Sequence, residues 1–127
     1  MAEEMVIWVD EKGKVLGPIP ISLANSDKKY LHLEVAVVIV NLNRKVLFQK
    51  RAKAKKVAPR VWTIAAAGHV TYGDTSELTA HKELTEEMGI TVKSLYPIFS
   101  SVETLERERH VIEWYLGLYQ GGEIVVQ

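Results

Sequence analysis

Short apolar runs separated by polar turns predict a chain built mostly from β-strands. The clearest run, residues 31–40, is rich in valine and apolar on both faces toward its end, as expected of a central strand. A turn at 41–44 joins it to residues 45–50, so these two strands should form a hairpin. Further strands are predicted at residues 5–9, 15–16, 62–66, 111–119 and 124–126. A break in regular structure is expected at residues 17–20, which contain one glycine and two prolines.

Residues 74–88 have the spacing of a helix. Its apolar positions share one stripe: Ala80, Leu84 and Met88. Asp74, with Glu77 three residues later, resembles a capping box, and Gly89 is typical of a helix C-terminus. Several strands around one strong helix indicate an α/β (α+β) fold, a mixed β-sheet sandwich. One helix is too few to cover both faces of such a sheet.

The composition narrows the classes of function. The chain has 127 residues, no cysteine, and sixteen basic against sixteen acidic residues, so we expect one domain over residues 1–127 without disulfides or a thiol nucleophile. A net charge of zero argues against a nucleic-acid partner. The longest apolar run, residues 35–40, is too short to cross a bilayer, and the N-terminus lacks a signal-peptide pattern. A cytoplasmic protein is expected.

Three carboxylates gather on one face of the predicted helix. Glu83, Glu86 and Glu87 are spaced i, i+3, i+4, where like charges repel, and they lie toward the helix C-terminus, where the dipole disfavours anions. A divalent cation would relieve both effects, because clustered carboxylate oxygens are the ligands that Mg²⁺ and Mn²⁺ prefer. A solvated acidic face is the alternative that these three residues alone leave open.

The residues around these carboxylates resemble the Nudix box, G-x5-E-x7-R-E-U-x-E-E-x-G-U, in which U is apolar. Residues 68–90 read GHVTYGDTSELTAHKELTEEMGI, and the spacing is intact. Seven of the specified positions match: Gly68, Glu83, Leu84, Glu86, Glu87, Gly89 and Ile90. The two departures keep their charge, with Asp74 in place of the first glutamate and Lys82 in place of the arginine. This pattern is far more specific than an isolated glycine motif.

The resemblance implies a Nudix fold with a catalytic loop–helix–loop, and Mg²⁺ or Mn²⁺ as the cofactor. The glutamates matching Glu83, Glu86 and Glu87 would bind the metal with a backbone carbonyl at Ala67 or Gly68. The implied reaction is metal-assisted attack of water on phosphorus in a nucleoside diphosphate linked to another group. In the family the first glutamate and the arginine stabilise the box by a salt bridge. Asp74 and Lys82 are the matching pair here, although lysine lacks the planar fork of arginine.

A basic segment precedes the box. No acidic residue lies between Val35 and Gly73, and eight basic residues fall between positions 44 and 60: Arg44, Lys45, Lys50, Arg51, Lys53, Lys55, Lys56 and Arg60. Arginine and lysine bind phosphate well, so the segment predicts recognition of a polyphosphate beside the metal helix. A solvated loop is the open alternative.

Residues 17–69 further resemble the isopentenyl diphosphate isomerase branch of the Nudix superfamily. The segments that carry this resemblance are residues 31–33, 49–52, 59–63 and 67–69. In those isomerases the residues matching Arg51 and Lys55 contact the diphosphate, and those matching His32 and His69 bind a metal. We take these four as candidate substrate-binding residues, while buried hydrogen-bonded histidines remain an alternative. Isomerisation needs a cysteine at the position of Ala67, so the resemblance implies an isomerase-like hydrolase.

Several expectations stay open. A general base is required, and Glu113, inside an otherwise apolar strand, is our candidate. The alternatives to a pyrophosphohydrolase are a diphosphate isomerase and a noncatalytic nucleotide-binding module. Family members usually continue with another strand and a closing helix, so we expect the C-terminal helix to be missing. An uncovered sheet face would also allow a homodimer.

Overall fold

The computed structural model describes residues 3–50 and 62–121. The strands are β1 (Met5–Val9), β2 (Val15–Pro20), β3 (Leu31–Asn41), β4 (Val46–Lys50), β5 (Trp62–Ile64), β6 (Ala66–His69), β7 (Leu95–Thr104) and β8 (Arg109–Tyr119). The helices are α1 (Ile21–Ala24) and α2 (Ser76–Met88). The candidate residues Arg51 and Lys55 and the predicted strand at 124–126 lie outside the described residues. No helix in the described part is long and apolar enough to span a membrane.

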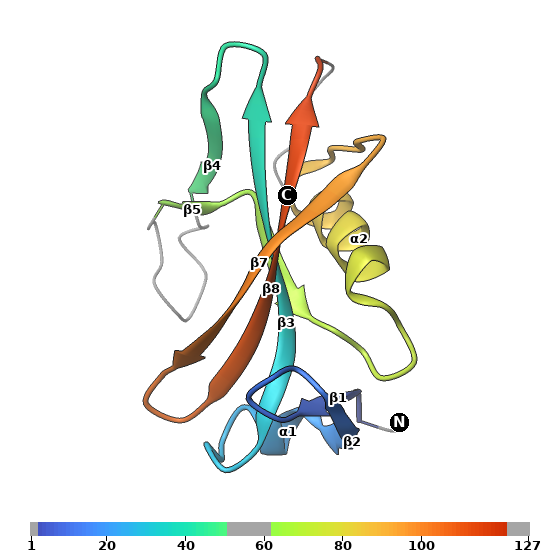
Figure 1. Cartoon of the computed structure of the whole chain (residues 1–127), viewed down its shortest axis with the longest axis vertical. Coiled ribbons are helices and arrows are strands. Elements are labelled where there is room, and N and C mark those ends of the chain that lie inside the picture. Colours follow the sequence, from blue (N-terminus) through green and yellow to red (C-terminus); the bar gives the residue numbers. More distant parts are fainter. Residues whose placement is uncertain (1–2, 51–61, 122–127) are drawn as a thin grey trace.

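The centre of the fold is β3, which pairs along both of its edges. On one edge it runs parallel to β8 over its full length, and β8 pairs antiparallel with β7. On the other edge it pairs in turn with β1, β6 and β4, all antiparallel. Figure 1 shows the long strands β3, β7 and β8 crossing at the middle of the molecule, with α2 beside them. The prediction of a mixed β-sheet with one long helix is confirmed for the described residues.

Alternating residues of β3 separate the two faces of the sheet. Those at odd positions, from Leu31 to Ile39, belong to the main hydrophobic cluster. From α2, the predicted stripe joins the same cluster: Ala80, Leu84 and Met88. At even positions β3 presents His32 and Glu34 to the opposite face, where His110 of β8 lies beside His32 in the parallel register. These three polar side chains therefore lie on the face of the sheet that α2 does not cover.

The structure corrects the predicted start of the helix. The helix begins at Ser76, and the N-cap is Thr75, whose hydroxyl accepts a hydrogen bond from the amide of Leu78 at 3.2 Å. The expected capping box at Asp74 is therefore wrong: Thr75 already has the extended backbone of a cap, and Asp74 is left to line a cavity. The predicted C-terminus is confirmed, since Gly89 adopts the left-handed conformation with φ of 65°.

Two strand predictions also need correction. Strand β2 continues through Pro18 and Pro20 instead of breaking. Among the described strands it pairs only with β1, and an edge strand tolerates residues that lack an N–H. The predicted strand at 62–66 is two strands, interrupted at Ala65, where the chain changes from pairing with β4 to pairing with β3. Within β6, as in any strand, successive residues point to opposite faces of the sheet, which matters for the site.

Candidate metal and phosphate site

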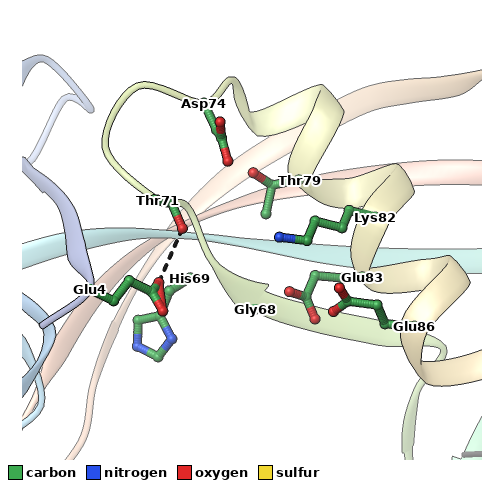
Figure 2. A pocket seen from close by; sticks show the side chains of 9 residues that line it. All are labelled: Glu4, Gly68, His69, Thr71, Asp74, Thr79, Lys82, Glu83 and Glu86. Carbon is green, nitrogen blue, oxygen red and sulfur yellow. Dashed lines mark hydrogen bonds between the residues drawn. The ribbon is translucent and has the colours of Figure 1, made fainter. Parts of the chain in front are cut away.

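Two cavities lie on either side of β6. The first, called here the helix cavity, has a volume of about 320 Å³, and Gly68 lines it. Figure 2 shows its charged side chains converging from α2, the preceding loop and the N-terminus. They are Glu4, Asp74, Lys82, Glu83 and Glu86, with His69 at the edge. The second, called the sheet cavity, has a volume of about 350 Å³ and is lined by Ala67 together with polar and apolar residues of β3, β7 and β8.

Glu83 lies directly against the backbone of Gly68. A Cβ atom at position 68 would be only 2.5 Å from the carboxyl carbon of Glu83, so a side chain there would displace this glutamate. Burial, together with the negative charges of Glu87 and Glu86, raises the pKa of Glu83 to about 7. Gly68, the first glycine of the motif, is thus required for the close approach of the Glu83 carboxylate. This carboxylate is surrounded by other negative charges.

Glu87 binds the neighbouring residue of the same strand. Its Oε2 atom accepts a hydrogen bond from the amide of Ala67 at 3.2 Å and another from Nε2 of Gln49 at 3.1 Å. Glu83 and Glu87 therefore hold two consecutive backbone positions of β6, which brings Ala67 and Gly68 next to the predicted metal ligands. Glu86 is exposed and lines the helix cavity beside Glu83. The three glutamates that the sequence singles out are brought together.

Asp74 and Lys82 face the same helix cavity but do not form an ion pair within 4 Å in the described part of the chain. Figure 2 shows the Lys82 ammonium reaching into the cavity toward Glu83 rather than toward Asp74. The positive charge of Lys82 lowers the pKa of Glu83 and partly offsets the effect of the other carboxylates. The side chain of Lys82 thus acts on the acidic cluster directly.

On the sheet-cavity side, three polar residues of β3 and β8 form a compact cluster: His32, Glu34 and His110. One ligating atom from each lies within 4.8 Å of the others. His110 contacts Glu34 through Nδ1 and Glu108 through Nε2, the latter at 3.1 Å. Nε2 of His32 and Nδ1 of His110 are 3.0 Å apart. We call these three residues the histidine cluster; its donor set could hold a divalent transition-metal ion.

The charges of the histidine cluster follow from burial and pairing. Burial, with the nearby charges of His110 and His69, lowers the pKa of His32 to about 4, so His32 is neutral near pH 7. Burial alone would lower the pKa of His110, but its hydrogen bond to Glu34 and the charges of Glu34 and Glu108 raise it above the usual value. Burial alone would raise the pKa of Glu34, yet the hydrogen bond from His110 keeps it below the usual value. His110 and Glu34 thus behave as an ion pair.

Of the two candidate histidines, His69 is the more accessible. His32 is completely buried and lines neither cavity described above, whereas His69 lines the helix cavity. Their rings stack with centroids 5.0 Å apart, and Nε2 of His69 lies 3.2 Å from Oδ1 of Asn25. The two histidines are therefore neighbours, although they come from different strands.

Glu113, the candidate base, lies near the middle of β8. It pairs in register with Val35, so its side chain is on the α2 face of the sheet. The hydroxyl of Tyr115 donates a hydrogen bond to Oε2 of Glu113 at 3.5 Å, and burial together with the charge of Glu113 raises the pKa of Tyr115. Glu113 lines neither the helix cavity nor the sheet cavity.

Two residues that the sequence did not suggest contact the site. Glu4 lines the helix cavity and accepts a hydrogen bond from the hydroxyl of Thr71 at 3.1 Å. Gln49 of β4 binds Glu87. Glu4 lies 67 residues from Thr71, and Gln49 lies 38 residues from Glu87, so no local spacing could have indicated either contact.

Comparison with known proteins agrees with this geometry. A family model described as the NUDIX domain matches residues 30–126, which is most of the chain. The chain belongs to the NUDIX family. Over 99 residues it is 30% identical to isopentenyl-diphosphate Delta-isomerase of Salmonella heidelberg, a match that covers 78% of this chain and 55% of the isomerase. The chain thus spans about half the length of the curated relatives that it matches.

Solved structures share the NUDIX fold at low sequence identity. The crystal structure of DR0079 from Deinococcus radiodurans gives a TM-score of 0.76 at 19% identity, covering 98% of this chain and 76% of that one. The NUDIX domain of Shewanella oneidensis NrtR, solved with ADP ribose, gives a TM-score of 0.64 at 18% identity, and the match covers 84% of this chain and 74% of that one. An Ap4A hydrolase complex from C. elegans gives a TM-score of 0.58 at 19% identity, and the match covers 75% of this chain and 72% of that one. These likenesses establish the fold.

Proposed function

We propose that this NUDIX protein is a hydrolase that cleaves the pyrophosphate bond of a nucleoside diphosphate linked to another moiety, using Mg²⁺ or Mn²⁺. The main observation in support of this proposal is that α2 packs against β6. Glu83 packs on Gly68 while Glu87 binds the amide of Ala67, so two carboxylates of one helix meet adjacent backbone positions. The three glutamates that match the metal ligands of the NUDIX box, Glu83, Glu86 and Glu87, are all retained here.

The acidic residues of the box fit a divalent cation. The raised pKa of Glu83 has burial and the charges of two other carboxylates as its causes, and a cation at this point would remove the electrostatic part. Oxygen ligands suit Mg²⁺ and Mn²⁺. Glu83, Glu86 and Glu87 would hold the ion, with a backbone carbonyl from Ala67 or Gly68. When bound, the ion neutralises phosphate charge and lowers the pKa of an attacking water.

The residues of the chain would bind and orient the substrate for an in-line displacement. Water oxygen forms a bond to one phosphorus, the bridging P–O bond breaks, and two phosphate products leave. Lys82, which lines the helix cavity together with Glu83, would contact a phosphate oxygen that approaches this glutamate. We propose that Arg51 and Lys55 contact the diphosphate, as the matching residues do in the isomerases. Glu113 remains our prediction for the base that accepts the proton of water.

The organic part of the substrate has room in the sheet cavity. This cavity adjoins Ala67, so a group there would lie next to the backbone that Glu87 holds. Its walls combine Trp114 and Ile112 with the carboxylates of Glu103 and Glu108. An aromatic wall beside hydrogen-bond acceptors suits a nucleoside, in agreement with the ADP ribose and Ap4A named for two structural neighbours.

The test is an assay of nucleoside monophosphate release from a panel of nucleoside diphosphate conjugates with Mg²⁺. We expect product with wild type, and a loss of about 100-fold or more for Glu86→Gln, which removes a proposed metal ligand. Glu106→Gln is the matched control, because Glu106 is exposed between β7 and β8 and lines neither cavity. Equal activity of wild type and Glu86→Gln would rule out the assigned site.

A diphosphate isomerase is the second candidate, and the histidine cluster is the observation in its favour. The isomerase relatives and the grouping of His32, Glu34 and His110 both support an isomerase-type metal site in addition to the box. Ala67 opposes it, because the isomerase chemistry implied by the resemblance needs a cysteine at this position. Incubation with isopentenyl diphosphate distinguishes the two: isomer formed above background would favour the isomerase, and hydrolysis products would favour our proposal. Tight nucleotide binding with no turnover would indicate a noncatalytic module.

A further inference from the structure

We infer that Gln49 is a positioning residue that orients Glu87 for cation binding, an inference that rests on the proposed function of the box. Gln49 is in β4, outside the 23-residue motif that contains Glu87. Its Nε2 atom lies 3.1 Å from Oε2 of Glu87 and 2.9 Å from the carbonyl oxygen of Ala65. One side-chain amide therefore connects the hairpin strand, the bend between β5 and β6, and the end of α2.

The geometry determines which way the amide of Gln49 faces. An amide NH₂ group has two hydrogens, and each has an acceptor here, one on Glu87 and one on Ala65. The reversed amide would place an oxygen against the carboxylate and the carbonyl oxygen, which is unfavourable. The donor orientation is thus set by the two acceptors, and the amide is held from both sides.

Glu87 needs such donors because of its position on the helix. It lies in the last turn of α2, which contains no basic residue, and the helix dipole disfavours a negative charge there. Glu87 is also close enough to Glu83 for its charge to raise the pKa of that residue. The amide of Ala67 and the amide of Gln49 both donate to Oε2, so they stabilise the ionised form and hold this oxygen in place.

The two hydrogen bonds to Oε2 of Glu87 have a consequence for the metal site. Partners that hold a ligand by hydrogen bonds determine the direction of its lone pairs, and removing them commonly reduces metal affinity. The backbone amide of Ala67 cannot be removed by a simple substitution, whereas the side chain of Gln49 can. Gln49 thus offers a way to disturb the orientation of Glu87 while its charge and the box sequence are retained.

The experiment is a double-mutant cycle on Mn²⁺ affinity, measured by electron paramagnetic resonance of free Mn²⁺ without substrate. The proteins are wild type, Gln49→Met, Glu87→Gln and the double variant. Methionine has nearly the length of glutamine but no donor. We expect Gln49→Met to raise the dissociation constant about 10-fold and to add nothing in the Glu87→Gln background. Gln120→Met, the same substitution at an exposed position after β8, is the control and should match wild type.

A structural role alone would give a different result. Thermal melting of each variant checks folding, and Gln49→His, which keeps one N–H donor, should retain more affinity than Gln49→Met and serves as the second variant. Unchanged Mn²⁺ affinity in a folded Gln49→Met protein, or an equal loss with and without the Glu87 carboxylate, would overturn the inference. If Glu87→Gln itself leaves the affinity unchanged, the proposed metal site fails instead. Binding without hydrolysis would count only against the proposed reaction.

Discussion

Glu83 gives the sharpest prediction about energetics, because the structure makes it both a proposed metal ligand and a source of instability. Its pKa is raised from 4.5 to about 7 by burial and by the charges of Glu87 and Glu86. A carboxyl whose pKa is higher in the folded state contributes stability that is fully present below pH 4.5 and is lost as the pH rises through 7. Replacement by the neutral isostere Gln should therefore stabilise the metal-free protein at alkaline pH.

The size of this effect can be bounded. A shift from 4.5 to about 7 corresponds to about 3 kcal/mol for a fully buried group. Glu83 is only partly buried, and solvent screening reduces the expected gain from Glu83→Gln to about 1 kcal/mol at pH 8. At pH 4 the wild-type carboxyl is already protonated, so wild type and variant should unfold at nearly the same urea concentration.

The assay is urea denaturation in EDTA at pH 4 and pH 8, followed by the same measurement with Mg²⁺ at pH 8. Added Mg²⁺ should stabilise wild type and should have little effect on Glu83→Gln, because a ligand stabilises only the protein that binds it. Glu106→Gln controls for loss of a surface charge. A variant that is less stable than wild type at pH 8 in EDTA, or a difference that does not depend on pH, would refute the electrostatic reasoning.

Three further predictions concern packing and charge. Gly68→Ala should keep the fold but weaken Mn²⁺ binding about 10-fold, measured by titration, because the new Cβ must displace the flexible carboxylate of Glu83. Gly117→Ala should destabilise the protein by about 1–3 kcal/mol in urea, because its Cβ would lie 2.7 Å from Leu95 in the core. Glu34→Gln should cost more stability at pH 6 than at pH 9. The pKa of His110, the partner of Glu34, is raised in the folded protein, so the stabilisation from this ion pair is lost as the pH rises through the pKa of His110. An equal cost of Glu34→Gln at both pH values would contradict the ion pair.

The elements that could be predicted from sequence are those with a local cause. The valine-rich run of β3 and the apolar stripe of α2 reflect burial of one face, and Gly89 ends the helix because it can adopt a positive φ. The three box glutamates were predictable as a group because helical spacing alone places them together. Their relation to Gly68 was implied by the motif and needed the structure to show contact.

The parts that could not be predicted depend on contacts between distant segments. The parallel pairing of β3 with β8 brings His32 to His110 across 78 residues, and no periodicity in either strand indicates it. The prediction of a break at residues 17–20 is wrong because a sequence does not show which strand will lie at an edge of the sheet. Glu4 reaches the helix cavity only because β1 packs beside the loop that follows β6, where Val6 forms a bridge with Thr71.

Crystals with Mn²⁺ and a nonhydrolysable diphosphate analogue would show directly whether Glu83, Glu86 and Glu87 hold a divalent cation. Anomalous scattering locates Mn²⁺ without reference to activity. We expect an anomalous peak within bonding distance of carboxylate oxygens of Glu83, Glu86 and Glu87, next to the backbone of β6, with the diphosphate bound to the same ion. A peak only at His32 and His110, with the box empty, would contradict it.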